Sequence, residues 1–513
     1  MADGTRLYTY GVRPAAGVTC PIVIQRTPYV PEEKPDIEAF AKAQAEALAR
    51  RYAYVVQHCR GCGMSEGEWI PYEDERADGL ATLDWLRGLP WYNGEIFLDG
   101  ASYLASVHFA YLDTNPSDVK GAAMSVQDVD RYNIVYRNGF FKIGLHGGWF
   151  VRGYKKKDRA LPRDVEARFR DFPLGDFSRR CWDRAVPALD NVIAHPRRDD
   201  PFWASDAAGS GARYRRALLD SRIPILLRTA LYDVYTDGIC KMWREIPRAR
   251  RANCALLIDA YDHGGRLADG MKGTCGEFPG GSRADEGVSP LDWFDYCRTG
   301  TPCAKAPPGR TRHYALWENR WVVSDELADG PRCIELPLGA ETHRWTYDPL
   351  RPPPDFPGSG GICFGGMQVQ PEPGFRDDVV SLILPPLAET VDVRGRMRTL
   401  LAVTSDCDDT SVYARVSVKK PDGRWYLLRD DITSLRADGS EYAPGTLKVV
   451  ELRFADHAFR LEKGDVLRVD VASASPSFAP HGNVAGPQSE VREPKTAHNS
   501  IDAKASSITL PCL

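Results

Sequence analysis

A serine on an expected strand-to-helix turn is the residue of this sequence best placed to do chemistry. The stretch from Glu95 to Ala105 reads EIFLDGASYLA, in which an apolar run ends in Gly100 and Ser102 precedes a second apolar segment. Such a turn presents a strained serine as a nucleophile. We expect Gly100 to be required, because a side chain there would collide with the backbone that folds past it. The backbone N–H of Tyr103, at the start of the next helix, would face a developing oxyanion.

The same stretch is compatible with a plainer role for Ser102. Leu104 stands where the motif G-x-S-x-G has its second glycine, and a serine at this place could simply cap a helix. The local sequence leaves both interpretations open. A nucleophilic serine also needs a base, and that base needs an acid to orient it, so the rest of the chain decides.

Two later segments offer the base and the acid. One apolar run ends shortly before Asp233, and another leads into His263 and two glycines. Open α/β sheets carry their sites in loops at the carboxyl ends of strands, here in the order serine, acid, histidine. We predict Asp233 as the acid and His263 as the base, with Asp237 and Asp262 as alternative acids. His108, on the helix after the serine, is expected to be packed or on the surface.

A second oxyanion donor is expected from an early loop, since this kind of site takes one there. The segment Arg26-Thr27-Pro28-Tyr29 follows the first expected strand. We predict that the Tyr29 hydroxyl is this donor, and the alternative is an ordinary core tyrosine. With a histidine base, activity should rise with pH near the unperturbed histidine pKa of ~6.5.

The elements that must position these residues alternate between apolar runs and helical patterns. Strands are expected at 21–25, 52–57, 95–98, 121–126, 223–229 and 254–258, and helices at 35–50 and 74–87. This alternation predicts an α/β fold, with a parallel sheet covered by helices on both faces. From about residue 128 to 219 the strand pattern stops, and a mostly helical insertion is expected.

After about residue 330 the sequence changes to Pro-rich connections and short alternating strands. Val412, Ala414, Val416 and Val418 should face one way, and Asp422-Gly423 marks a hairpin turn. This region predicts a β-sandwich or jelly roll. The expected division is an α/β domain at 1–127 and 220–330, a helical insertion at 128–219 and a C-terminal β-sandwich or jelly roll at 331–513.

Composition narrows the class of function. The 513 residues carry a formal net charge of −4, which gives no electrostatic case for binding nucleic acid or an anionic membrane. No apolar run approaches a membrane span, and the first residues lack a signal-peptide pattern, so a cytoplasmic protein with reduced thiols is expected. Cys59 and Cys62 form a lone CxxC without a partner pair at zinc spacing, so no metal and no other cofactor is expected.

Several ordered segments together resemble the cocaine esterase and X-Pro dipeptidyl-peptidase family of serine hydrolases, whose members also include α-amino-acid ester hydrolases and glutaryl acylases. The segments are Asp3-Gly4-Thr5-Arg6-Leu7, Arg26-Thr27-Pro28-Tyr29, Arg60-Gly61, Ser65-Glu66-Gly67-Glu68, Pro90-Trp91-Tyr92-Asn93-Gly94, Gly100-Ala101-Ser102-Tyr103-Leu104, Leu231-Tyr232-Asp233, Asp262-His263, Trp345-Thr346-Tyr347-Asp348-Pro349 and Pro421-Asp422-Gly423. The resemblance covers nearly the whole chain.

The resemblance implies an α/β-hydrolase domain, a helical cap and a C-terminal jelly roll. It implies Ser102 as nucleophile, Asp233 as orienting acid and His263 as base, with the Tyr29 hydroxyl and the Tyr103 N–H as oxyanion donors. Tyr235, two residues after the acid, would form an aromatic wall of the acyl pocket. Aromatic residues of the insertion are candidates to line that pocket beside it, Trp149 among them, with core packing as the alternative.

The expected function is a cofactor-free serine hydrolase that cleaves an ester of a small molecule. One alternative is an X-Pro dipeptidyl-peptidase or amide acylase with the same triad, for which Asp128, Asp130 and Asp158 are candidate ligands of a substrate amine. An alternative of another class is a catalytically inactive binding protein on the hydrolase scaffold. The sequence leaves a homodimer open.

Overall fold

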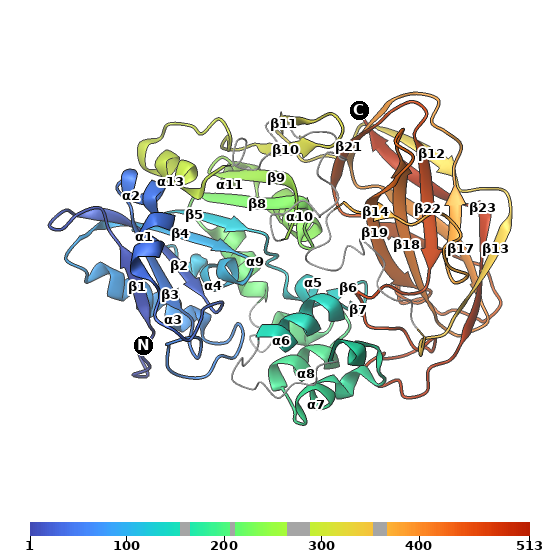
Figure 1. Cartoon of the computed structure of the whole chain (residues 1–513), viewed down its shortest axis with the longest axis horizontal. Coiled ribbons are helices and arrows are strands. Elements are labelled where there is room, and N and C mark those ends of the chain that lie inside the picture. The colour runs from blue at the N-terminus through green and yellow to red at the C-terminus, as the bar shows by residue number, and fades with distance from the viewer. Residues whose placement is uncertain (154–164, 206–210, 264–287, 352–366) are drawn as a thin grey trace.

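The computed structural model describes residues 1–153, 165–205, 211–263, 288–351 and 367–513 (Figure 1). The chain begins in an α/β region, drawn from blue through green to yellow, and ends in a large β region, drawn from yellow-orange to red. Short helices lie beside both of them. In the described part of the chain, no helix combines the length and apolar character needed to cross a membrane.

A nine-stranded sheet forms the centre of the α/β region, in the order β1-β3-β2-β4-β5-β8-β9-β10-β11. The strands from β3 to β10 pair in parallel, whereas β1 and β11 lie antiparallel at the two edges. The bounds are β1 Thr9–Val12, β2 Cys20–Thr27, β3 Ala53–His58, β4 Tyr92–Ala101, β5 Val119–Ser125, β8 Ile225–Tyr232, β9 Cys254–Asp262, β10 Thr311–Ala315 and β11 Arg320–Ser324.

The central strands are buried on both faces, which explains their near-continuous apolar sequences. Every residue of β9 is buried, and so is every residue of β8 except Arg228. All six strands expected from the sequence are present. Strands β1, β10 and β11 of this sheet were not predicted. The four residues of β1 are of mixed polarity and partly exposed, so they carry no strand pattern.

Helices of the α/β region cover the sheet. They are α1 Ile37–Ala43, α2 Ala45–Ala49, α3 Glu75–Arg87, α4 Tyr103–Phe109, a 3₁₀ turn at Leu112–Thr114, α10 Thr236–Glu245, α11 Arg248–Arg251 and α13 Pro290–Thr299. The single helix expected at 35–50 is interrupted at Gln44. Of these two short helices only Ala47 is buried, so little packing is available to hold one long helix together.

The described residues between β5 and β8 are mostly helical, as expected, and include one small hairpin. The elements are α5 Arg131–Val135, β6 Tyr136–Arg137, β7 Phe140–Phe141, a π-helix at Ile143–Gly147, α6 Gly148–Gly153, 3₁₀ turns at Val165–Arg170, Leu174–Asp176 and Pro201–Ala204, α7 Phe177–Trp182, α8 Pro187–Ala194 and α9 Gly211–Asp220. The exact division into domains, with its three boundaries, stays a prediction.

Two antiparallel sheets form the C-terminal region, and two further strands pair with the long last strand of one of them. One sheet has the order β20-β17-β23-β16-β21 with β12 and β13 paired to β23, and the other has the order β14-β19-β18-β22-β15. The bounds are β12 Arg332–Pro337, β13 Thr342–Tyr347, β14 Val369–Gln370, β15 Val380–Ile383, β16 Val391–Gly395, β17 Arg398–Ser405, β18 Ser411–Lys419, β19 Trp425–Ser434, β20 Lys448–Arg453, β21 His457–Leu461, β22 Val466–Ala472 and β23 Ala497–Cys512.

Strand β18 is buried on both of its faces. The hairpin between β18 and β19 is present, with Gly423 in the left-handed region at φ 83°. All of β18 is buried except its last residue, although only every second residue from Val412 to Val418 is aliphatic. The second face is covered because Tyr413 packs in a cluster with Phe140 of β7 and with Phe478. The helical region and the β region therefore share apolar side chains.

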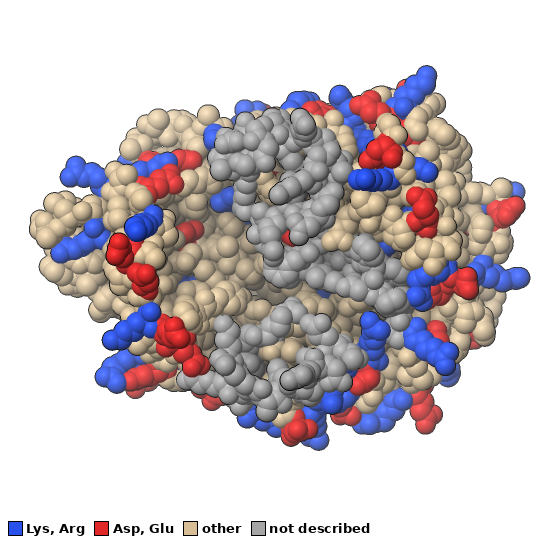
Figure 2. All heavy atoms as spheres, in the orientation of Figure 1, with Lys and Arg blue, Asp and Glu red and all other residues tan. Residues whose placement is uncertain are grey.

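Polar contacts also join the three regions near β8. Arg137 of β6 pairs with Asp237 of α10 at 2.6 Å and with Asp431 of β19 at 2.5 Å. Tyr232, the last residue of β8, donates a hydrogen bond to the carbonyl oxygen of Leu427 at 3.0 Å. Both contacts lie next to the loop that follows β8. On the face drawn in Figure 2, acidic and basic side chains of the described residues are intermingled.

Candidate active site

Ser102 lies on a sharp turn between β4, which ends at Ala101, and α4, which begins at Tyr103. Its backbone has φ 57° and ψ −130°, an unfavourable conformation for a residue with a side chain. The Ser102 N–H donates to the carbonyl oxygen of Ser125 at the end of β5, at 2.9 Å, and this bond ties the turn to the sheet. A Cβ on Gly100 would lie 2.3 Å from the carbonyl oxygen of Leu104. The expected strain and the need for glycine are both confirmed.

The alternative role of Ser102 as a helix cap does not fit the geometry. Ser102 occupies the position before α4, but within the described part of the chain its side chain caps no backbone N–H of that helix. Its Oγ lies instead 3.1 Å from Nε2 of His263. The two residues are 161 positions apart in the sequence.

His263 follows β9 and connects the serine to Asp233. Its Nδ1 lies 2.6 Å from Oδ2 of Asp233, whose side chain is fully buried. The other carboxylate oxygen accepts a hydrogen bond from the backbone N–H of Tyr235 at 2.7 Å, which fixes the carboxylate. The alternative acid Asp237 is directed elsewhere, since it pairs with Arg137. The structure thus places Ser102, His263 and Asp233 in one hydrogen-bonded series.

The charge of Asp233 sets the basicity of His263. Burial of the ring lowers the pKa of His263, but the charge and the hydrogen bond of Asp233 outweigh it, so the pKa lies above the usual histidine value. The expectation of an unperturbed pKa is thereby corrected upward. A histidine made more basic by a buried carboxylate accepts the serine proton more readily.

Tyr29 lies in the loop after β2 with its side chain 45% exposed, so it is not a core tyrosine. Its hydroxyl oxygen accepts a hydrogen bond from Nε1 of Trp149 at 2.9 Å. Because an indole N–H only donates, this contact uses a lone pair of the Tyr29 oxygen and leaves the hydroxyl proton directed elsewhere. Trp149 also stacks on Tyr103, with ring centroids 5.7 Å apart. Both expected oxyanion residues therefore contact the same tryptophan.

Tyr235 lies beside the base. Its ring meets the imidazole of His263 edge-on, with centroids 5.5 Å apart, and it is 7% exposed. This contact is compatible with the expected wall of a pocket. Phe150, the next aromatic residue after Trp149, is fully buried and packs in the core.

A small cavity of about 100 Å³ lies behind the acid rather than above the serine. It is lined by residues from all three regions, including Asp128, Lys142, Asp233, Asp237 and Asp431. Burial, followed by the neighbouring carboxylate of Asp130, raises the pKa of Asp128 to about 7.

The sequence reasoning did not find the side chains that hold Tyr103. The Tyr103 hydroxyl contacts three residues of the segment that leads into α3: Trp69, Tyr72 and Glu75. Glu75 begins an amphipathic helix, and an acid there is usually a solvated residue that favours the helix dipole. Its burial, at 4% exposed, is the signal that only the structure supplies.

His108 takes no part in the hydrogen-bonded series around Ser102, since its ring contacts Tyr111 and the backbone of Asp99. His108 is fully buried, and burial lowers its pKa to about 3, as suits a packed neutral ring. Among the described residues, no group of three or more His, Cys, Asp or Glu side chains is arranged to hold a metal ion.

Comparison with known proteins gives the family. Residues 3–265 match the model for X-Pro dipeptidyl-peptidase (S15 family), and residues 341–508 match that for the X-Pro dipeptidyl-peptidase C-terminal non-catalytic domain. Cocaine esterase from Rhodococcus sp. (strain MB1 Bresler) is 25% identical over 488 residues, which is 85% of this chain and 82% of that protein.

Solved structures agree on the fold along the whole chain. An aminopeptidase from a marine sediment Thaumarchaeota archaeon has a TM-score of 0.81 at 17% identity, and an α-amino acid ester hydrolase has a TM-score of 0.78 at 18% identity. Each match covers 100% of this chain and 95% of the other chain. The chain is a serine hydrolase with an α/β-hydrolase-like first part and an antiparallel C-terminal β domain, and it belongs to the X-Pro dipeptidyl-peptidase S15 family.

Proposed function

We propose that this serine hydrolase cleaves a carboxylic ester of a small molecule through an acyl-enzyme. Ser102 is the nucleophile, His263 the base and Asp233 the acid that orients it. The hydroxyl of Tyr29 and the backbone N–H of Tyr103 donate hydrogen bonds to the oxyanion. The observation that carries the proposal is the pair of contacts that links Ser102 to His263 at 3.1 Å and His263 to Asp233 at 2.6 Å.

The reaction has two halves. In the first, His263 takes the proton of Ser102 as the serine oxygen bonds to the ester carbonyl carbon, and it then gives that proton to the departing alcohol. In the second, His263 takes a proton from water, whose oxygen attacks the acyl carbon, and returns it to Ser102 as the acid leaves. The negative carbonyl oxygen of each tetrahedral intermediate receives the two hydrogen bonds, which are stronger there than in the ground state.

We favour an ester over a peptide substrate because two of the candidate carboxylates of the helical region are poorly suited to bind a substrate amine. A peptidase that binds a free amino terminus needs an available carboxylate. Asp130 pairs with Arg198 and caps α5, while burial and Asp130 raise the pKa of Asp128 to about 7. Asp158, the third candidate, lies outside the described residues. The relative named cocaine esterase is, by its name, an ester-cleaving enzyme.

The proposal is tested with two chromogenic substrates, an ester and an anilide, whose released leaving groups are both measured by absorbance. A p-nitrophenyl acyl ester should be turned over and Gly-Pro p-nitroanilide should not. A fluorophosphonate probe should label the wild-type protein at Ser102 and leave Ser102→Ala unlabelled. Preferential cleavage of the anilide would replace the ester with a dipeptide substrate, and an unlabelled wild-type protein would point to a binding protein without catalysis.

A further inference from the structure

The side chain of Tyr103 is anchored far more firmly than an ordinary core tyrosine. Its hydroxyl donates to Oε1 of Glu75 at 2.8 Å, and it accepts from the Tyr72 N–H at 2.9 Å and from Nε1 of Trp69 at 3.2 Å. A tyrosine hydroxyl has one proton and two lone pairs, so this set uses its full capacity. Burial and then the Glu75 carboxylate raise the pKa of Tyr103 well above its usual value, which keeps the proton on the oxygen.

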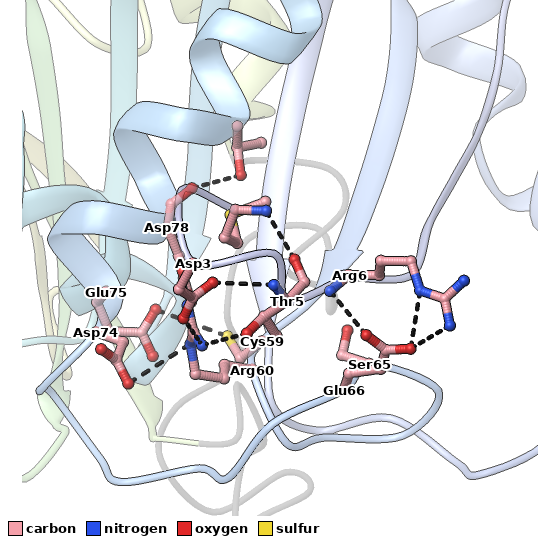
Figure 3. Close-up of polar contacts among 12 residues, drawn as sticks. Asp3, Thr5, Arg6, Cys59, Arg60, Ser65, Glu66, Asp74, Glu75 and Asp78 are labelled. Atoms are coloured by element: carbon pink, nitrogen blue, oxygen red, sulfur yellow. Dashed lines mark hydrogen bonds and ion pairs between the residues drawn. The ribbon is translucent and has the colours of Figure 1, made fainter.

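The carboxylate of Glu75 also contacts the strand that leads to Tyr29. Glu75 Oε2 lies 3.2 Å from Nη1 of Arg26, which is fully buried and donates from the same nitrogen to the Glu75 backbone oxygen at 3.0 Å. Arg26 lies near the end of β2, three residues before Tyr29. The thiol of Cys59, 3.9 Å away, completes the surroundings of the carboxylate (Figure 3).

We propose that Glu75 is a positioning residue that holds both oxyanion donors in register, through Tyr103 on one side and through Arg26 on the other. This inference rests on the proposed function, in which the Tyr103 N–H and the Tyr29 hydroxyl bind the oxyanion. Glu75 itself touches neither the substrate nor Ser102. It acts only on the positions of the two oxyanion donors, the Tyr103 N–H and the Tyr29 hydroxyl.

The cost of burying the Glu75 carboxylate and the Arg26 guanidinium argues against a role in stability alone. A buried carboxylate and guanidinium are costly to desolvate, and apolar residues of similar volume often replace such a pair without loss of stability. Burial raises the pKa of Glu75, against the opposing effects of Arg26 and Tyr103. A group that is costly to bury yet contacts Tyr103 and also Arg26, three residues before Tyr29, fits the need to hold catalytic geometry within about 0.5 Å.

Glu75→Gln is the sharpest variant, because the amide keeps the shape and an acceptor for the Tyr103 hydroxyl while the charge that holds Arg26 is lost. We expect kcat for the p-nitrophenyl ester to fall about 10- to 100-fold, less than the loss of a whole oxyanion donor, while KM changes by less than about threefold. Glu75→Asp, which keeps the charge on a shorter arm, should recover part of the loss. A trifluoromethyl ketone, whose adduct with serine carries an oxyanion, should bind Glu75→Gln more weakly by the same factor.

Asp78→Asn is the matched control. Asp78 lies one turn further along α3, its side chain is 1% exposed, and it pairs with Arg60 at 2.6 Å rather than with Arg26 or Tyr103 (Figure 3). It should lose thermal stability as Glu75→Gln does, yet keep kcat and ketone affinity within about threefold of wild type, since it removes no oxyanion contact. Equal kinetic losses in the two variants would overturn the inference and reduce Glu75 to a structural residue.

Tyr103→Phe keeps the proposal testable if the Glu75 variants fail to fold. It removes the anchoring hydroxyl and leaves the backbone N–H, so kcat should fall about tenfold or more with KM nearly unchanged. The double variant Glu75→Ala/Tyr103→Phe should lose clearly less than the product of its two single losses, because Glu75→Ala and Tyr103→Phe each remove the hydrogen bond between these two side chains. Fully independent effects would contradict the inference. Failure of the proposed function is recognised separately, by undiminished turnover in Ser102→Ala.

Discussion

Trp149 of the helical region donates its indole N–H to the hydroxyl oxygen of Tyr29 at 2.9 Å, across 120 positions of sequence. The contact restricts the rotation of a hydroxyl that, in the proposed mechanism, points its proton at the oxyanion. Tyr29→Phe removes the donor, and kcat should fall about 10²- to 10³-fold. Trp149→Phe keeps a ring but releases the hydroxyl, and a smaller loss of about tenfold is expected. Steady-state kinetics with the p-nitrophenyl ester measure both, and a Trp149→Phe loss as large as that of Tyr29→Phe would show that the indole has another role.

Replacement of the nucleophile should abolish turnover. Ser102→Ala removes the atom that attacks the carbonyl carbon, so kcat should fall by about 10⁴-fold or more. Ser106→Ala, the same change one turn further along α4 at a fully buried position, is the control and should stay labelled by a fluorophosphonate. Labelling that persists in Ser102→Ala would place the nucleophile elsewhere.

The pH dependence should follow His263. Only the neutral imidazole accepts a proton, and its pKa lies above the usual value because of Asp233, so kcat/KM should rise with pH through a midpoint above ~6.5. Asp233→Asn removes the charge and leaves the burial that lowers the pKa, so the midpoint should move to lower pH while the rate falls about 10⁴-fold. Rate profiles of both proteins between pH 5 and 9 check this. An unchanged midpoint in Asp233→Asn would show that the charge of Asp233 does not set the pKa of His263.

The nucleophile turn should tolerate no side chain at its glycine. In Gly100→Ala the new methyl group would lie 2.3 Å from the carbonyl oxygen of Leu104, which is backbone and cannot rotate away. We expect a loss of about 1–3 kcal/mol in the free energy of unfolding, together with reduced activity. Gly88→Ala is the control, because its added Cβ would meet its nearest neighbour at 3.4 Å. Equal denaturation midpoints for the two variants would contradict the crowding.

The ion pair between Arg137 and Asp431 should stabilise the junction of the three regions. The Asp431 side chain is only 2% exposed, so Arg137→Met leaves its carboxylate buried and should cost about 3 kcal/mol. Adding Asp431→Asn removes the unpaired charge and should restore part of that loss. Urea denaturation compares the three proteins, and a double variant no more stable than Arg137→Met would show that the charge is not the cause.

The sequence predicted best those features that depend on a short stretch of chain. The strand-to-helix turn, Gly100 and the order of Ser102, Asp233 and His263 follow from backbone sterics and from the topology of parallel sheets, and each is visible in one stretch of chain. Tyr29 was predicted from its place in the loop after an early strand, with a core tyrosine as the alternative, and the resemblance to a family implied the same residue.

What the sequence could not supply depends on long-range packing. The burial of Glu75 arises from the contact of α3 with Arg26 and Tyr103. An acidic residue at the start of a helix is usually exposed, so the sequence does not predict this burial. The second buried face of β18 needs Phe140, which is more than 270 positions earlier. The upward shift of the His263 pKa likewise depends on a distance, not on a residue type.

The cluster of Tyr413, Phe140 and Phe478 has a practical consequence for protein engineering. Chimaeras that exchange the C-terminal half between relatives would cut through a shared interior, and each parent would bring aromatic side chains shaped for its own counterpart. A successful swap would have to transplant the short hairpin β6–β7 together with the strands it covers, so the crossover points should follow that interior and not the linear order of the chain.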